Sequence, residues 1–206
     1  MKSNPTHWDT IFSNSETTGL GWYEKDSILS LKFLNQIKNW QALTILVTGT
    51  GTSALIEDLM VESTKLILND ISAEAINLVK KRIGEKANQI TWLCQDIASS
   101  LPTTLPLIDI WFDRAVLHFL IEEVDVVGYF NNIKTFIKIG GHVILAEFST
   151  TGALKCAGLT VHRYSLDELS NNMGTDFQLL HHLETTFINP RGEPRPYIYA
   201  LFKRIK

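Results

Sequence analysis

Apolar residues recur along this chain at two spacings, and the alternation of the two predicts strands that alternate with helices. Short apolar runs predict five strands, at residues 43–47, 65–69, 90–95, 107–112 and 142–148. Apolar positions at helical spacing predict helices between them, from about Asp26 to Trp40, near 53–61, from Ser72 to Ile83, and from Val126 to Ile137. Gly140 and Gly141 are expected to end the last of these helices. The alternation indicates a parallel sheet with right-handed crossovers and helices on both faces.

The end of the chain departs from this alternation. Ser165 and Glu168 form the ends of a capping box that is expected to open a short helix. Two strand-like runs, Phe177–Ile188 and Tyr197–Arg204, then follow each other with only a loop between them. Consecutive strands joined by a loop pair in antiparallel fashion, so the mostly parallel, seven-stranded sheet is expected to end in a reversed last strand.

Length and composition predict one domain over residues 1–206, with an N-terminal arm and helix at 1–41 before a core at 42–206. The net charge of −3 gives no reason to expect binding to nucleic acid or to an acidic membrane. Cys94 and Cys156, the only cysteines, have no metal-ligand spacing, so neither a disulfide framework nor a metal site is expected. Cys94 lies in an apolar run and is expected to be buried and inert. No signal peptide or membrane-spanning run is seen, which favours a cytoplasmic protein. A monomer or a homodimer is expected.

The first candidate for chemistry is a small-residue turn between the strand at 43–47 and the helix after it. Gly49, Thr50 and Gly51 form its centre. Without side chains at the two glycines, a ligand can approach the main chain, and the free N–H groups of the next helix attract acceptor or anionic atoms. This order of strand, glycine turn and helix is typical of a site for a nucleotide-like cofactor.

Acidic residues recur where successive strands end. Asp70 follows the second strand, 19 positions after Gly51, close to the roughly 20 expected for an acid that hydrogen-bonds ribose hydroxyls. Asp96 follows the third strand, where a carboxylate can accept from an adenine amino group. Asp109 and Asp113 lie near the ends of the fourth. Each acid alone could be an ordinary loop residue, but their recurrence favours a nucleoside site.

Two cofactors are compatible with these features. Gly49, Gly51 and Ala54 match the spacing of the dinucleotide fingerprint, which allows a nicotinamide cofactor. However, the only pair with the Tyr-x-x-x-Lys spacing of a dehydrogenase, Tyr199 and Lys203, lies in a strand pattern and not on a helix. S-adenosylmethionine (SAM) needs backbone donors, a ribose acid and an adenine acceptor, and Asp70 and Asp96 supply the last two.

The stretch from Trp111 to Leu120, WFDRAVLHFL, resembles a subgroup of class I SAM-dependent methyltransferases that carry a Trp-x-Asp-Arg-Ala-Val-x-His-Phe-Leu sequence after strand four. Residues 140–145, GGHVIL, resemble the fifth-strand motif of the same superfamily, and Cys156 to Tyr164 resemble the subgroup's loop before the last helix. The resemblance covers most of the chain. It implies a Rossmann-like, doubly wound fold with a reversed seventh strand, and a SAM-dependent methyltransferase.

The resemblance also implies roles for individual residues. Residues expected to hold the cofactor are Gly49, Thr50, Gly51, Asp70, Ile71, Asp96, Ile97 and Asp113. Asp113, Arg114 and His118 are expected to lie beside the methyl donor or the acceptor, with Arg114 and His118 on one helix face. Trp22 and Tyr23 either face the acceptor over the cofactor, where cation–π attraction suits a sulfonium, or simply attach the arm to the core.

Two positions depart from the family pattern. Val47 replaces the acid that usually ends strand one, and Phe112 replaces a frequent histidine before Asp113. The expected reaction is in-line methyl transfer to a small molecule or a protein side chain, and an amine acceptor would lose its proton to His118 or Asp113. The alternatives are a catalytically impaired binding domain, suggested by Val47, and a nicotinamide oxidoreductase.

Overall fold

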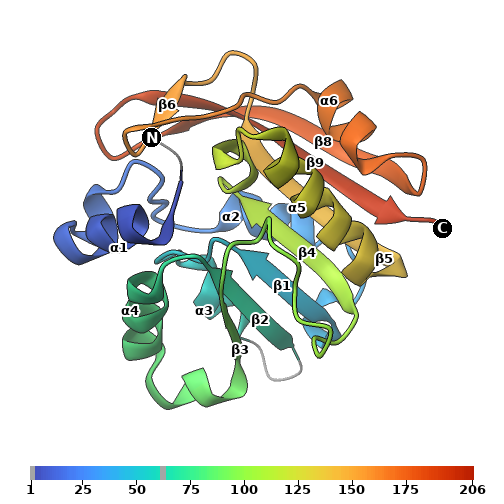
Figure 1. The fold of residues 1–206 in the computed structure, drawn as a ribbon, viewed down its shortest axis with the longest axis horizontal. Helices are drawn as coiled ribbons and strands as arrows, with labels where there is room; N and C mark the ends of the chain where they lie inside the picture. Colours follow the sequence, from blue (N-terminus) through green and yellow to red (C-terminus); the bar gives the residue numbers. More distant parts are fainter. Residues whose placement is uncertain (1–2, 61–63) are drawn as a thin grey trace.

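One seven-stranded sheet runs through the molecule in the order β3-β2-β1-β4-β5-β9-β8 (Figure 1). The computed structural model describes residues 3–60 and 64–206. The parallel strands are β1 (Thr44–Thr48), β2 (Lys65–Asp70), β3 (Thr91–Cys94), β4 (Ile108–Arg114) and β5 (Ile137–Phe148). The two remaining strands are β8 (Phe177–Ile188) and β9 (Pro194–Arg204), and β9 is antiparallel to both β5 and β8. The predicted fold class is therefore confirmed.

The last strand is inserted into the sheet, so that β8 and not β9 forms the edge. Side-chain burial follows from this order. In β9 every residue from Tyr197 to Phe202 is buried, as in a strand covered on both faces, whereas burial in β8 alternates along the strand. The continuous apolar run in β9 is the sequence signal of this central position.

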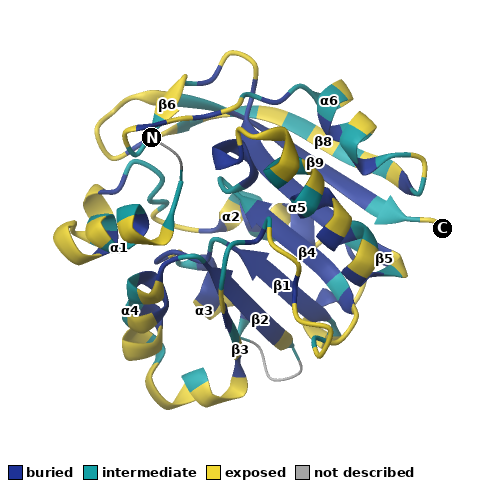
Figure 2. Ribbon diagram, viewed as in Figure 1, coloured by how far each residue is buried: buried dark blue, intermediate teal, exposed yellow. Residues whose placement is uncertain are grey.

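Helices cover both faces of the sheet, and Figure 2 shows that the central strands are mostly buried. The buried apolar side chains form one hydrophobic cluster on each face. One face carries α1 (Pro5–Asn14), α2 (Ile28–Leu34), α3 (Leu55–Leu59) and α4 (Ala73–Ile83). The other carries α5 (Glu123–Phe136) and α6 (Leu166–Met173). The shorter elements are the 3-10 turns η1 (Thr17–Gly19), η2 (Trp40–Ala42), η3 (Gly84–Gln89) and η4 (Leu117–Phe119), and the small hairpin β6 (Lys155–Cys156) and β7 (Leu159–Thr160). None of the helices in the described parts of the chain is long and apolar enough to cross a membrane.

Several predicted boundaries are wrong. The helix expected up to Trp40 ends at Leu34; Ile37 and Trp40 are buried but lie beyond it. The helix near 53–61 is only α3, and residue 61 lies outside the described residues. Cys94 is exposed and not buried.

The glycine pair at 140–141 does not end a helix. Helix α5 stops at Phe136, and the pair lies within β5, where the pairing with β4 shifts register. A Cβ on Gly141 would lie 2.9 Å from the Lys138 carbonyl oxygen and 3.0 Å from that of Asp109. Close approach of the backbones is therefore what requires glycine here.

The N-terminal arm contains a helix that the hydrophobic pattern did not predict. Asn4 caps α1 by accepting from the His7 N–H at 2.9 Å, and Pro5 occupies its first turn. The Asp9 carboxylate then accepts from the Ser72 hydroxyl at 2.6 Å, at the start of α4. Helix α1 is thereby fixed beside α4, as Figure 1 shows.

Helix α5 holds the loop that follows β3. The Asn132 side-chain amide donates to the carbonyl oxygens of Ile97 and Ser99, both at 2.8 Å. One turn earlier, Gly128 faces Ala98: a Cβ at Gly128 would lie 2.2 Å from the Ala98 carbonyl oxygen. The loop can pack this closely only because Gly128 has no side chain.

We expect Gly128→Ala to destabilise the protein. Overpacking against a backbone carbonyl costs about 1–3 kcal/mol, more than the up to about 1 kcal/mol that alanine gains over glycine in a helix. Urea unfolding measures the difference. Gly19→Ala is the matched control, because the space around that glycine is open. Equal midpoints for the two variants would contradict the proposed packing of α5 on the loop.

Candidate functional site

A cavity lies beyond the carboxyl ends of β1, β2, β3 and β4, with the N-terminal arm as one wall. This is where an open parallel sheet binds its ligands. The lining is mainly apolar, with a few polar groups from the strand ends and the glycine turn, which is the usual composition of a small-molecule site. It consists of Ser3, Trp8, Phe12, Trp22, Gly49, Gly51, Asn69, Asp70, Ile71, Gln95, Asp96, Ile97, Arg114, Ala115, Val116, Phe119, Leu120 and Cys156.

The glycine turn forms the floor of the cavity. Gly49 and Gly51 have φ angles of +53° and +49°, in the left-handed region that favours glycine. A Cβ at Gly49 would lie 2.0 Å from a methyl carbon of Val116, so the side chain of Val116 occupies the space that Gly49 leaves free. Thr50 points away from the cavity and its hydroxyl donates to the Asn69 carbonyl oxygen at 2.9 Å.

Asp70 fastens the glycine turn to the end of β2. Its Oδ2 accepts from the Gly51 N–H at 2.7 Å, and its Oδ1 accepts from the Ser72 N–H at 2.9 Å. Burial raises the pKa of Asp70 to about 6, although these backbone N–H groups oppose the shift. A carboxylate has about four acceptor positions, so Asp70 can bind a hydroxyl group in addition to the backbone.

Asp96 and Ile97 begin the turn after β3 and complete this side of the cavity. Asp96 accepts from the Ala98 N–H at 2.9 Å, which shapes the turn, and its side chain stays partly exposed to the cavity. The Ile97 carbonyl oxygen is held by Asn132, as described above. The Asp96 carboxylate can accept from a donor at the edge of a planar heterocycle, and the Ile97 side chain can pack against the face of the ring.

Arg114, the last residue of β4, attaches the N-terminal arm to the cavity. Its guanidinium forms an ion pair with Glu24 at 2.8 Å and donates to the Trp22 carbonyl oxygen at 3.2 Å. The same group donates to the Tyr199 hydroxyl at 3.2 Å and lies over the ring of Tyr197, 5.1 Å from its centre. The ion pair is largely shielded from water, with side-chain exposures of 13% and 21%. Arg114 therefore fixes the segment that carries Trp22.

Below the cavity, buried carboxyl groups hold the turn after β4. Asp113 accepts from the Val116 N–H at 3.0 Å and from the Tyr129 hydroxyl at 2.6 Å. Glu147 on β5 accepts from the His118 N–H at 3.1 Å and lies 2.8 Å from the Nδ1 of the same histidine. The side chains of Asp113, Glu147 and His118 are completely buried.

Burial also changes the protonation of these carboxyl groups. It raises the pKa of Glu147 to about 8, although the N–H groups of His118 and Leu117 oppose the shift. Burial raises the pKa of Asp113 as well, and the nearby Glu147 raises it further. Two acids in one dry site cannot both ionise, so the pair retains at least one proton at neutral pH.

The structure brings six of the eight expected cofactor positions to one cavity: Gly49, Gly51, Asp70, Ile71, Asp96 and Ile97. Thr50 lies behind the glycine turn and Asp113 lies beneath the cavity. Trp22 lines the cavity, and it packs edge-on against Trp8 and Phe12, so it both faces the site and attaches the arm. Tyr23 does not line this cavity; it lines a smaller hollow together with Thr48, Thr50 and Thr52.

One geometric expectation about Arg114 and His118 is wrong. They do not share a helix face, because Arg114 ends β4 and His118 lies in η4. Between them Ala115 adopts a φ of +67°, which turns the chain sharply. As a result Arg114 points to the cavity, whereas His118 points into the core beside Phe148.

Sequence reasoning missed several cavity residues. Val116, Phe119 and Leu120 lie in the stretch from Trp111 to Leu120 that carries the family resemblance, but no site role was predicted for them, and Cys156 lies on a distant hairpin. Nothing local in the sequence indicates that these residues meet. Trp8 and Phe12 could have been assigned to a helix, because Asn4 and Pro5 form a helix-start signal before a pair spaced by one turn.

Comparison with known families and structures gives a consistent result. The sequence profile of one family, described as a methyltransferase domain, matches residues 41–188. A search of curated protein sequences returned no match.

Among solved structures, the chain is similar to a SAM-dependent methyltransferase from Anabaena variabilis, with a TM-score of 0.78, 16% identity, and coverage of 97% of this chain and 93% of that one. It is also similar to the N-methyltransferase NodS from Bradyrhizobium japonicum in complex with S-adenosyl-L-homocysteine (TM-score 0.72, 13% identity, coverage 98% and 98%). A third is a SAM-dependent methyltransferase from Methanosarcina mazei (TM-score 0.69, 15% identity, coverage 88% and 99%). At these identities the likeness shows a shared fold.

We expect Glu147→Gln to flatten the pH dependence of stability. Between the ordinary pKa of 4.5 and about 8, folded Glu147 keeps a proton that the unfolded chain has lost. The free energy of unfolding of the unmodified protein therefore falls as pH rises through this window. The neutral glutamine removes this contribution, so the variant gains stability relative to the parent between pH 5 and pH 8. Urea unfolding at several pH values measures it.

The matched control for this series is Glu85→Gln, which alters an exposed carboxyl group. Its stability should change with pH in parallel with that of the unmodified protein. A Glu147→Gln profile that also ran parallel would contradict a buried, protonated Glu147.

Proposed function

This chain belongs to the methyltransferase domain family, and from that premise we propose that it transfers a methyl group from SAM to a small molecule or a protein side chain. The sequence-based identification of a SAM-dependent methyltransferase is confirmed at the level of family and fold. One observation carries the assignment of the site: Gly49, Gly51, Asp70 and the Asp96–Ile97 turn line a single cavity.

The residues of the cavity fit the parts of SAM. The glycine turn gives the methionine part access to backbone N–H groups, and Asp70 retains acceptor positions for the ribose hydroxyls. Asp96 can accept from the adenine amino group, with Ile71 and Ile97 against the ring. When bound, SAM supplies a methyl group already activated by its sulfonium, so the protein contributes mainly alignment and exclusion of water.

We assign the acceptor side to the wall formed by the arm. Trp22 presents an aromatic ring there, which attracts a sulfonium by cation–π interaction. Arg114 lines the same wall and keeps Trp22 in place through the arm backbone and Glu24. We propose that Arg114 positions this wall and does not move a proton, since a guanidinium stays charged.

Asp113 and His118 are better suited to supporting the site than to touching the acceptor. Both side chains are fully buried, and neither lines the cavity. Asp113 holds the Val116 N–H, and Val116 in turn packs on Gly49. We therefore propose that these two residues position the turn after β4, and that the acceptor is a group that needs no protein base, such as a carboxylate or a thiolate.

The absence of an acid at Val47 raises the alternative of an impaired binding domain. Val47 is buried between Leu68 and Phe112 in the sheet. However, Asn69 and Asp70 of β2 hold the glycine turn through three hydrogen bonds of 2.7–2.9 Å. These bonds support a functional turn without an acid on β1, and we favour an active enzyme. The cytoplasmic location and the monomeric or homodimeric state stay predictions.

A nicotinamide oxidoreductase is the least favoured reading. Tyr199 and Lys203 both lie on β9, where four residues span about 13 Å, so they cannot act as an adjacent pair. The Tyr199 hydroxyl accepts from Arg114 instead.

We expect saturable binding of SAM and S-adenosyl-L-homocysteine by isothermal titration calorimetry. Asp70→Ala should weaken both by about tenfold or more, because it removes an ionised acceptor and releases the glycine turn. The control is Asp109→Asn, at the other end of the sheet, where Asp109 pairs with Lys138. Binding of NAD(H) with no response to either SAM or S-adenosyl-L-homocysteine would refute the proposal.

A further inference from the structure

A second hollow adjoins the cofactor cavity on the acceptor side. It lies between the arm segment 19–22, the β6–β7 hairpin and the loop that joins β8 to β9. Trp22 and Cys156 line both the cavity and this hollow, so the two are adjacent. A molecule lying in the hollow therefore contacts Trp22, part of the wall at which we place methyl transfer.

The charges around this hollow are unusual for the protein. Three cationic side chains, Lys155, Arg191 and Arg195, line it together with a single acid, Glu193. The chain as a whole carries a formal charge of −3. The hollow is thus a local positive region on a mildly acidic molecule, and such a region attracts anions.

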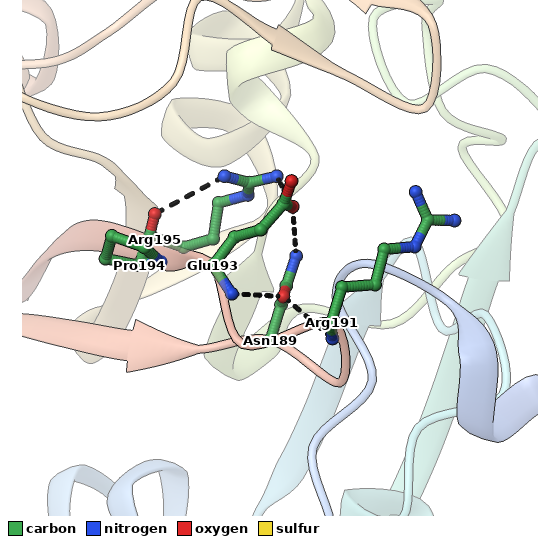
Figure 3. Close-up of polar contacts among 5 residues, drawn as sticks. All are labelled: Asn189, Arg191, Glu193, Pro194 and Arg195. Atoms are coloured by element: carbon green, nitrogen blue, oxygen red, sulfur yellow. Dashed lines mark hydrogen bonds and ion pairs between the residues drawn. The ribbon is translucent and has the colours of Figure 1, made fainter.

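Hydrogen bonds of the Asn189 side chain fix the conformation of the loop between β8 and β9, which carries Arg191 and Glu193. Asn189 is buried, and its side-chain oxygen accepts from the N–H groups of Arg191 at 3.0 Å and Glu193 at 2.9 Å. Its amide donates to the Glu193 carboxylate at 2.8 Å, and Arg195 pairs with the same carboxylate. Figure 3 shows this cluster, with the Arg191 guanidinium extending away from it. The one acid of the hollow is therefore engaged within the loop.

We propose that the methyl acceptor carries an anionic group, a carboxylate or a phosphate, that binds in this hollow to Arg191, with Lys155 adding attraction. The proposal rests on the proposed methyl transfer and names its substrate class. A planar guanidinium binds both kinds of anion through two parallel hydrogen bonds, which fixes the orientation of the acceptor. Such anchoring away from the reacting atom supplies the alignment on which methyl transfer depends.

The first test measures anion binding without any reaction. Succinate and inorganic phosphate are titrated separately into the protein, with and without S-adenosyl-L-homocysteine, at low ionic strength. We expect saturable binding of at least one probe, and the two probes tell a carboxylate site from a phosphate site. Arg191→Gln should weaken it by about tenfold, as expected for loss of a charge-assisted contact, and Lys155→Gln/Arg191→Gln more. Arg191→Lys keeps the positive charge but loses the planar guanidinium and its two parallel hydrogen bonds, so it should retain part of the affinity.

The second test uses methyl transfer from labelled SAM. Each acceptor carries a thiol for methylation and, at its other end, a carboxylate or a phosphate. It is paired with the same thiol that carries a neutral amide or a hydroxyl group in place of the anion. We expect the anionic member of a pair to be methylated with the lower KM, and Arg191→Gln to raise that KM with little change for neutral acceptors. Lys81→Gln, an exposed cation on the distant helix α4, serves as the control for both tests.

The outcomes separate this proposal from the one on which it rests. Failure of S-adenosyl-L-homocysteine to bind refutes the cofactor site. The anion titration without S-adenosyl-L-homocysteine still tests whether the hollow binds anions. Anion binding that is absent, or that Arg191→Gln and Lys81→Gln change equally, overturns the proposal. Equal methylation of neutral and anionic acceptors overturns it as well.

Discussion

The site depends on buried carboxyl groups that accept hydrogen bonds from the backbone of the turns beyond the strands. Asp70 holds the glycine turn, Asp113 holds Val116, and Glu147 holds His118. A buried N–H without a partner is costly, and the strand carbonyl oxygens bond only some N–H groups of these turns, those of Thr50 and Ala115 among them. The carboxyl groups meet that need, and in doing so they determine where the cavity floor lies. Burial raises the pKa of each, and at Asp113 and Glu147 the protein keeps a proton at neutral pH that a water-exposed acid would have lost.

These contacts also join parts of the chain that are far apart in sequence. Val116 connects the turn after β4 to Gly49, and Arg114 connects the same turn to Trp22 and Glu24 in the arm. On the other side, Asn132 of α5 holds the loop that carries Ile97. The glycine turn and the arm side of the cavity are therefore both supported by one turn, residues 114–118, which lies within the stretch Trp111 to Leu120.

Much of the fold and of the cofactor side could be predicted from local patterns. Strand ends and a glycine turn have sequence signals, and parallel strands place their ends together, which is why Asp70 and Asp96 were found. The predictions failed where tertiary contacts decide. The contact of His118 with Glu147 joins residues 29 positions apart, and no spacing rule describes it. The helix expected to reach Trp40 stops at Leu34, although Ile37 and Trp40 are buried as expected of an apolar face.

The attachment of helix α1 makes one side of the cavity depend on the start of helix α4. Trp8 and Phe12 line the cavity, and Asp9, between them, accepts from the Ser72 hydroxyl. The backbone N–H of the same serine donates to Asp70. The arm side of the cavity and the carboxylate at the end of β2 therefore share one residue, so a change at Ser72 alters both at once.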